Sequence, residues 1–286
     1  MADNNSNRIR KAIVSQDDFS VKKKFSQNFL LDENIIHKII DSAKIDNTTC
    51  VIEIGPGLGA LTKEIVKLAK SVIVYEIDED LIPHLQRLIG SFKNLILLNK
   101  DILKANVEED ILNHFDGCER TVVISNLPYH ITTPIIMKFL EELKNIDSMV
   151  LMMQLEVAQR ITSKPNTKDY NALSVIIQHQ TIAKYLFKVP KAVFYPQPNV
   201  DSAVIRLDII KEVNQTDNTE FYNFVHKCFS QRRKTLVNNL ANGYNKYAKD
   251  ELIEILSKEK INPQTRAEVL GLEEFMKLYQ NYFRES

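Results

Sequence analysis

Five short apolar runs recur through the first half of the chain and limit its fold more than any other feature. They are Val51–Ile54, Val72–Tyr75, Leu95–Leu98, Thr121–Ile124 and Met149–Met153, and their starts lie 21 to 28 residues apart. Each interval leaves room for one helix, so strands and helices should alternate. This alternation predicts an α/β fold with a parallel, doubly wound sheet whose strands are buried on both faces.

The pattern changes in the second half of the chain. Two later apolar segments, Ile182–Val189 and Ala203–Ile209, have no crossover helix between them, so we expect them to pair antiparallel at the edge of the sheet. From residue 219 onward only helical periodicity remains. We therefore predict a flexible N-terminal arm over residues 1–20, an α/β domain over 21–210 and a small all-helical C-terminal domain over 211–286.

Composition places the chain in a broad class. Of its 286 residues, 44% are hydrophobic and 26% charged, which is typical of a globular protein without membrane spans. The N-terminus has no apolar signal segment, and the net charge of zero still permits local basic surfaces. The three cysteines, Cys50, Cys118 and Cys228, are widely spaced. We expect them to be free thiols in a reducing cytosol, with neither a disulfide nor a metal site.

Three of the seven glycines follow the first predicted strand directly. Gly55, Gly57 and Gly59 open the next helix, where glycine lets the backbone approach a ligand closely. The spacing also fits a dinucleotide-binding loop, with Glu76 as the acid that binds a ribose. The glycines alone therefore leave two cofactors open, a nicotinamide dinucleotide and S-adenosylmethionine, with a purely structural tight turn as the third alternative.

Polar residues stand at the carboxyl ends of four successive strands of the predicted sheet. Glu53 lies two residues before the first glycine, and could hold a cationic amino-acid group or fix the loop. Glu76 and Asp101 end the next two strands, and Asp101 is placed to accept a hydrogen bond from an adenine amine. Asn126 ends the fourth. Four such residues on one rim predict a cofactor crevice.

The segment Ser125–Tyr129 has the groups needed to hold a planar amine. The side-chain oxygen of Asn126 can accept a hydrogen bond from an exocyclic NH₂ group. Pro128 favours an extended Leu127 and so directs the Leu127 carbonyl, and Tyr129 offers a face on which a base can stack. A polar turn at the end of a strand is the alternative for this segment.

With these residues the chain resembles the ribosomal RNA adenine dimethyltransferases, specifically the small-subunit family of the bacterial kasugamycin-resistance enzyme. The resemblance runs from Lys23 to Leu240. Its motifs are Gln27–Leu30, Glu53–Gly59, Asn126–Tyr129, Gln154–Arg160, Val193–Ser202 and Gln231–Leu236. The glycine loop is common to many methyltransferases, whereas the Asn-Leu-Pro-Tyr and Phe-x-Pro-x-Pro-x-Val-x-Ser motifs are specific.

The resemblance implies a Rossmann-like class I methyltransferase sheet with an antiparallel last strand and a helical C-terminal domain that contacts RNA. It implies cofactor contacts from Asn28, Leu30, Gly55, Glu76, Asp101 and Asn126. It also implies that Tyr129 and Phe194 hold the target adenine. The expected reaction is S-adenosylmethionine-dependent dimethylation of two adjacent adenines in the 3′-terminal hairpin of 16S rRNA, by a cytoplasmic monomer acting on the 30S subunit during its maturation.

Two basic clusters are candidate phosphate contacts: Lys22, Lys23 and Lys24 near the N-terminus, and Arg232, Arg233 and Lys234 in the C-terminal region, with Lys227 one helical face away. A solvated charged face is the alternative for each.

The sequence departs from the family pattern at Ser26, His130 and Asn171. We assign His130 no proton-transfer role and expect Asn171 to keep the left-handed turn of a glycine.

Three other functions remain open from the sequence. One is a 23S rRNA adenine methyltransferase of the macrolide-resistance type, against which the Gln231–Leu236 segment and the proline-rich motif argue. Another is a non-catalytic RNA-binding or assembly factor on the same fold, which the retained Asn126, Tyr129 and Phe194 disfavour. The last is a nicotinamide-dependent oxidoreductase, for which the sequence shows no hydride-transfer residues.

Overall fold

The computed structural model describes residues 28–214 and 218–284, so the predicted arm lies outside the described residues. The chain divides into two compact units. One comprises Met1–Ala158 and Lys184–Ile209, and the other comprises Gln159–Ala183 and Ile210–Ser286. The second unit thus includes residues 159–183, which the sequence analysis places in the α/β domain. Across the described residues, no helix combines the length and apolarity needed to cross a membrane.

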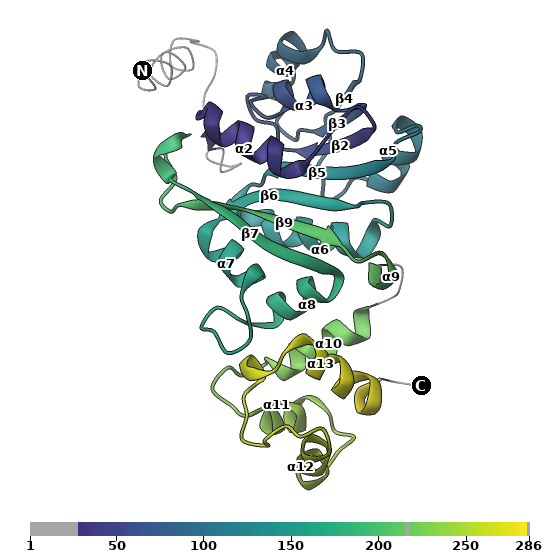
Figure 1. Ribbon diagram of the computed structural model, residues 1–286, viewed down its shortest axis with the longest axis vertical. Coiled ribbons are helices and arrows are strands. Elements are labelled where there is room, and N and C mark those ends of the chain that lie inside the picture. The colour runs from purple at the N-terminus through teal and green to yellow at the C-terminus, as the bar shows by residue number, and fades with distance from the viewer. Residues whose placement is uncertain (1–27, 215–217, 285–286) are drawn as a thin grey trace. The chain divides into compact units, whose positions relative to one another are not determined.

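The first unit is built on a seven-stranded sheet (Figure 1). In spatial order the strands are β4 (Leu95–Leu98), β3 (Ser71–Tyr75), β2 (Thr49–Ile54), β5 (Arg120–Asn126), β6 (Ser148–Gln154), β9 (Ser202–Ile209) and β7 (Thr181–Val189). The first five are parallel and contain the five predicted apolar runs, whereas β9 runs antiparallel to β6. The predicted fold class is confirmed, and the strand order reverses between β2 and β5, where α/β sheets bind ligands.

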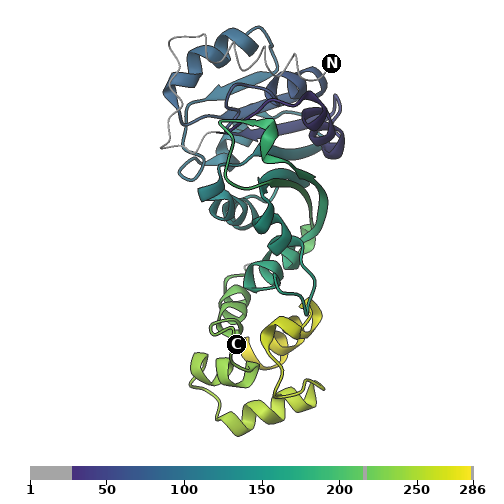
Figure 2. The ribbon, with the colours of Figure 1, turned by 90° about the vertical axis from the view of Figure 1, so that its left-hand side faces the viewer.

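Helices cover both faces of this sheet (Figures 1 and 2). On one face, α2 (Glu33–Ala43) and α3 (Thr62–Leu68) share a buried cluster with Val72 and Val74, and α4 (Ile82–Ile89) packs on β4 beside it. Tyr75 points to the other face, where its hydroxyl donates to Asp110 of α5 (Val107–His114) at 2.9 Å. The helix α6 (Thr132–Glu142) follows β5 after a 3₁₀ turn over Tyr129–Ile131.

A separate two-stranded sheet joins parts of the chain that are far apart in sequence. β1 (Phe29–Leu30) pairs antiparallel with β8 (Phe194–Tyr195), so that Leu30 faces Phe194. The backbone N–H of Leu31 adds a hydrogen bond to the Val193 carbonyl at 2.9 Å. The N-terminal segment and the proline-rich motif are therefore fixed side by side.

The second unit is predominantly helical. It contains α8 (Ala172–Gln180), α9 (Lys211–Asn214), α10 (Thr219–Cys228), α11 (Leu236–Gly243), α12 (Lys249–Lys258), α13 (Leu272–Leu278) and a π-helical turn over Tyr279–Phe283, while α7 (Leu155–Thr162) spans the boundary. Its core is aromatic: the Phe283 ring lies 5.0 Å from Phe224 and 4.9 Å from Tyr244, measured between ring centroids. Asn171 is extended, with φ −158°, and caps α8 through its side chain, so the expected left-handed turn is wrong.

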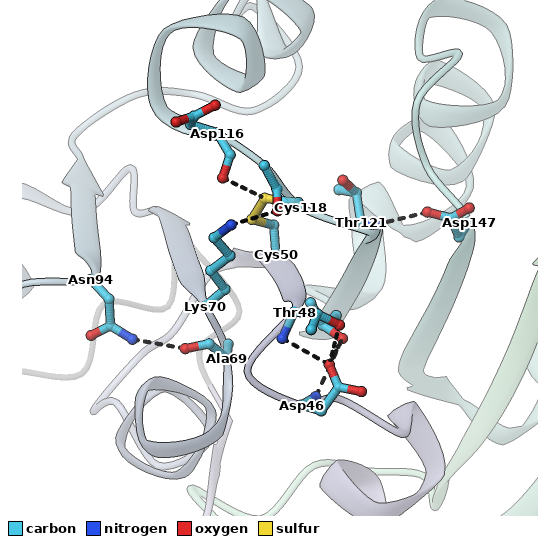
Figure 3. Close-up of a disulfide and its surroundings, with 12 residues drawn as sticks. Asp46, Thr48, Cys50, Ala69, Lys70, Asn94, Asp116, Cys118, Thr121 and Asp147 are labelled. Carbon is cyan, nitrogen blue, oxygen red and sulfur yellow. Dashed lines mark hydrogen bonds between the residues drawn. A yellow bond between two sulfur atoms is a disulfide. The ribbon is translucent and has the colours of Figure 1, made fainter.

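The expectation of three free thiols is also wrong. Cys50 on β2 and Cys118, which precedes β5, form a disulfide with their Cα atoms 5.8 Å apart (Figure 3). The two strands are neighbours in the sheet although the cysteines are 68 residues apart, and that proximity is invisible in the cysteine spacing. Cys228 remains free and buried, and burial raises the pKa of its thiol.

Reduction of this bond should destabilise the first unit. Closing a loop of 68 residues stabilises a fold by about 4 kcal/mol in the chain-entropy model. We expect the melting temperature to fall on reduction, and a Cys118→Ser variant to melt like the reduced protein. Thiol titration of the unreduced, denatured protein should find one free thiol. Three free thiols would contradict the bond.

Candidate active site

The loop between β2 and α3 has a backbone conformation that depends on its glycines. Gly55, Gly57 and Gly59 have φ of 63°, 59° and 77°, in the left-handed region that other residues rarely adopt. A Cβ on Gly57 would lie 3.0 Å from the Phe29 ring, so β1 packs directly against the loop. A Cβ on Gly59 would instead lie 2.8 Å from the Leu88 side chain of α4.

A cavity of about 1020 Å³, including its open mouth, lies at the carboxyl ends of the parallel strands. Of the residues predicted from the sequence, it is lined by Asn28, Leu30, Glu53, Gly55, Gly57, Glu76, Asp101, Asn126, Leu127, Pro128 and Tyr129. Gly59 and Phe194 do not line it. The structure thus brings nearly all the predicted cofactor and amine-binding residues to one cavity.

Three carboxyl groups face this cavity from different strand ends. Glu53 is 1% exposed, and its Oε2 has no hydrogen-bond partner among the described residues. Burial raises the pKa of Glu53 to about 8 and the Glu76 carboxylate adds to the shift, although Thr62, close to the other side of the carboxyl group, opposes it. Asp101 is half-buried and accepts a hydrogen bond from the Leu103 N–H at 3.0 Å, which fixes the turn after β4.

Glu76 is held by the backbone around it. Its Oε1 accepts a hydrogen bond from the Asp78 N–H at 2.8 Å. Burial raises the pKa of Glu76 to about 7, although hydrogen bonds from the N–H groups of Asp78 and Gly57 oppose that shift. The carboxylate therefore bridges the end of β3 and the glycine loop, where it can accept from ligand hydroxyl groups.

The amide of Asn126 has only one reasonable orientation. Its Nδ2 donates to the backbone carbonyl of Asn28 at 3.1 Å, and a carbonyl oxygen can only accept. The reverse orientation would place two acceptors against each other. Asn126 therefore contributes its side-chain oxygen to the cavity as an acceptor. Leu127 is fixed next to it by the hydrogen bond from its N–H to the Met152 carbonyl at 3.0 Å.

The two aromatic residues predicted to hold a base are placed differently. Tyr129 is half-buried and lines the cavity, and the neighbouring His130 is exposed. Phe194 is 1% exposed and belongs to the hydrophobic core that also contains Leu30. Tyr129 therefore belongs to the lining of the cavity. Phe194 does not, because it lies on the strand that pairs with β1, opposite Leu30.

The predicted RNA contacts also differ among themselves. Lys22, Lys23 and Lys24 lie outside the described residues. In the second unit, the Lys227 ammonium lies 3.8 Å from the centre of the Tyr244 ring. Arg232, Arg233 and Lys234 are all exposed, as binding to a phosphate group requires. Arg232 also donates to the Lys168 carbonyl at 2.5 Å and pairs with Glu268 at 3.7 Å.

Some lining residues were not predicted. Ile77 and Ile102 directly follow the acids Glu76 and Asp101 and give the cavity apolar walls, and Ile77 is 46% exposed. Lys100 also lines the cavity and pairs with Asp110 at 2.7 Å. An apolar residue immediately after each strand-end acid was the signal that could have identified the two isoleucines.

In the part of the chain that the structure describes, no group of three or more His, Cys, Asp or Glu residues could hold a metal ion.

The sequence also matches known proteins over nearly its whole length. The family model described as ribosomal RNA adenine dimethylase matches residues 18–283. The chain belongs to this family. It is 46% identical over 274 residues to ribosomal RNA small subunit methyltransferase A of Bacillus mycoides, which covers 94% of this chain and 93% of that protein. The Bacillus cereus protein of the same name matches with the same identity and coverage.

Solved structures of rRNA methyltransferases share the fold of this dimethylase. A dimethyladenosine transferase from Plasmodium falciparum is 27% identical with a TM-score of 0.75, over 89% of this chain and 97% of that one. A 23S rRNA methyltransferase is 26% identical with a TM-score of 0.68, over 88% and 98%. The fold is therefore that of class I rRNA methyltransferases, and the protein is an enzyme of the adenine dimethylase family.

The buried Glu53 should make the stability of this dimethylase depend on pH. Its pKa is about 8 in the folded state against 4.5 for the free group, so the folded state keeps a proton that the unfolded chain releases. This stabilisation is complete below pH 4.5 and is lost as the pH rises through about 8. We expect the free energy of unfolding in urea to fall by roughly 3 kcal/mol from pH 5 to 8 through this group.

Glu53→Gln keeps the shape of the side chain and removes the titration. Its unfolding free energy should therefore vary less with pH than that of the wild type, because the other titrating groups are common to both proteins. Equal pH slopes for the two proteins would show that Glu53 titrates normally in the folded state.

Proposed function

We propose that this enzyme transfers methyl groups from S-adenosylmethionine to N6 of two adjacent adenines in the 3′-terminal hairpin of 16S rRNA, dimethylating each. We further propose that it acts on the 30S subunit during maturation, as a monomer in the cytoplasm. The 46% identity to small-subunit methyltransferases supports the choice of subunit. The observation that carries the chemistry is the Asn126 amide in the cavity lining, whose nitrogen donates to the Asn28 carbonyl and whose oxygen is left as an acceptor.

The residues around the cavity fit S-adenosylmethionine. Glu76 would accept from the ribose hydroxyls, and Asp101 from the adenine amine, with Ile77 and Ile102 against the faces of the ring. Glu53 has a buried oxygen without a partner among the described residues, beside the loop where a cationic amino-acid group would lie. When bound, the cofactor supplies an electrophilic methyl group on a sulfonium centre.

The target amine is a poor nucleophile because its lone pair is delocalised into the adenine ring. The Asn126 side-chain oxygen and the Leu127 carbonyl would accept its two hydrogens and favour a pyramidal nitrogen. Tyr129 would stack on the base and hold the freed lone pair toward the methyl donor. The residues then act by positioning and electrostatics, and water can take the proton from the acidic alkylated nitrogen.

Phe194 is proposed as the second face of the base sandwich, but in this structure that face is covered. The base would contact it only if the segment around β8 moves on RNA binding.

A loop adenine is the favourable substrate, because unstacking it costs less than unstacking a base within a duplex.

The most direct test is methyl transfer from labelled S-adenosylmethionine to unmethylated 30S subunits and to naked 23S rRNA. We expect label in the 30S subunit, mapping to two adjacent adenines. Label confined to 23S rRNA would assign the enzyme to the macrolide-resistance type, and binding of the cofactor without transfer to either RNA would indicate an assembly factor.

Asn126→Ala should remove the acceptor for the amine, together with the hydrogen bond to the Asn28 carbonyl, while keeping the fold. We expect the single-turnover rate of methyl transfer to fall at least about 100-fold, as is usual for the loss of a transition-state hydrogen bond. The melting temperature should change little, because Asn126 is half-buried at the end of its strand. A near-normal rate would contradict the proposed mechanism.

Exposed cations of the second unit should contribute to RNA affinity. The double substitution Arg233→Ala and Lys234→Ala should weaken 30S binding and reduce the slope of log affinity against log salt by about 0.7 to 0.9 for each phosphate group that the variant no longer binds. The double substitution Lys249→Ala and Lys258→Ala removes two exposed lysines of α12 and serves as the charge-matched control. An equal reduction in the control would show that only overall charge matters.

A further inference from the structure

The hydroxyl of Tyr129 is tethered to a residue that has no assigned role. Its oxygen lies 2.7 Å from Oγ of Ser202, the first residue of β9. Ser202 is fully buried, whereas the Tyr129 ring is half-buried and lines the cavity. The hydrogen bond therefore joins the outer end of a cavity-facing ring to the core of the sheet.

Ser202 itself is held on a rigid frame. It stands opposite Gln154 in the β6–β9 ladder, and the N–H of Leu155 donates to the Asp201 carbonyl at 3.0 Å. Both carboxylate oxygens of Asp201 are also engaged, one by the Lys191 N–H at 2.9 Å and the other by the Lys188 ammonium at 2.7 Å. Backbone and side-chain contacts thus fix the position of the serine oxygen.

The other end of the tyrosine is fixed as well. Tyr129 begins the 3₁₀ turn, and the preceding Pro128 carbonyl accepts hydrogen bonds from the Ile131 N–H at 3.2 Å and the Thr132 hydroxyl at 3.1 Å. With its backbone in this turn and its hydroxyl on Ser202, the ring is held at both ends. A phenylalanine in this place would keep the stacking face and lack the tether.

We propose that Ser202 is a positioning residue for methyl transfer, which fixes the plane of the Tyr129 ring against which the target base stacks. This inference rests on the proposed function of Tyr129. A fixed ring lowers the entropy cost of bringing the amine into line with the methyl donor, and that benefit belongs to the chemical step. The loss of Ser202 should therefore lower kcat and leave KM for the cofactor unchanged.

A double-mutant cycle tests this inference. Ser202→Ala and Tyr129→Phe remove the same hydrogen bond from opposite sides, and each should lower kcat on 30S subunits about two- to tenfold, as expected for one hydrogen bond. Because the bond can be removed only once, the double variant should be no slower than the slower single variant. Additive effects, or a wild-type kcat in Tyr129→Phe, would overturn the proposal.

A matched control separates positioning from stability. Ser148 is a buried serine at the start of β6 whose Oγ accepts a hydrogen bond from Arg206 at 3.3 Å. Ser148→Ala should cost stability like Ser202→Ala and leave kcat unchanged at temperatures where both variants are folded. An equal loss of kcat in the two variants would reduce Ser202 to a structural residue.

The tether can also be observed without methyl transfer, which separates this inference from the proposed function. A 3-fluorotyrosine at position 129 should give a ¹⁹F resonance shifted from that of the free amino acid, because the ring is held in one environment. In Ser202→Ala the resonance should move toward the free value. An unchanged resonance would overturn the tether even if the enzyme methylates its RNA.

Discussion

The hydrogen bond from the Asn126 amide to the Asn28 carbonyl orients the side chain on which the proposed chemistry depends. It joins the carboxyl end of β5 to the residue before β1, 98 positions away in the chain. β1 in turn pairs with β8 and packs its Phe29 ring on Gly57. One amide thus joins the end of β5 to the strand that contacts the glycine loop and the proline-rich motif, and it is oriented by a partner that can only accept.

The proposed function assigns the lining of the cavity to two neighbouring groups of residues. Glu53, Glu76 and Asp101 offer acidic acceptors from three strand ends, which suits a ligand with hydroxyl and amine groups. Asn126, Leu127 and Tyr129 form the neighbouring part, which suits a planar amine. Burial raises the pKa values of Glu53 and Glu76, and under the proposed function the cofactor would bind beside both carboxyl groups.

Much of the architecture could be predicted because each signal was local. The apolar runs indicated five parallel strands, and the polar residue that followed a run marked the rim of the cavity. Features that depend on distant pairing could not be predicted in this way. The disulfide between Cys50 and Cys118 needs β2 beside β5, and the covered face of Phe194 needs β8 beside β1. Nothing in the local sequence around Ser202 indicated its hydrogen bond with Tyr129.

The central claim is that Asn126 accepts a hydrogen bond from the target amine through its side-chain oxygen. A structure of the enzyme with its RNA and an unreactive cofactor analogue tests this most directly. The account predicts the adenine N6 atom about 2.9 Å from Oδ1 of Asn126, with Nδ2 still on the Asn28 carbonyl. A rotated amide, or an N6 atom held by other groups, would contradict it.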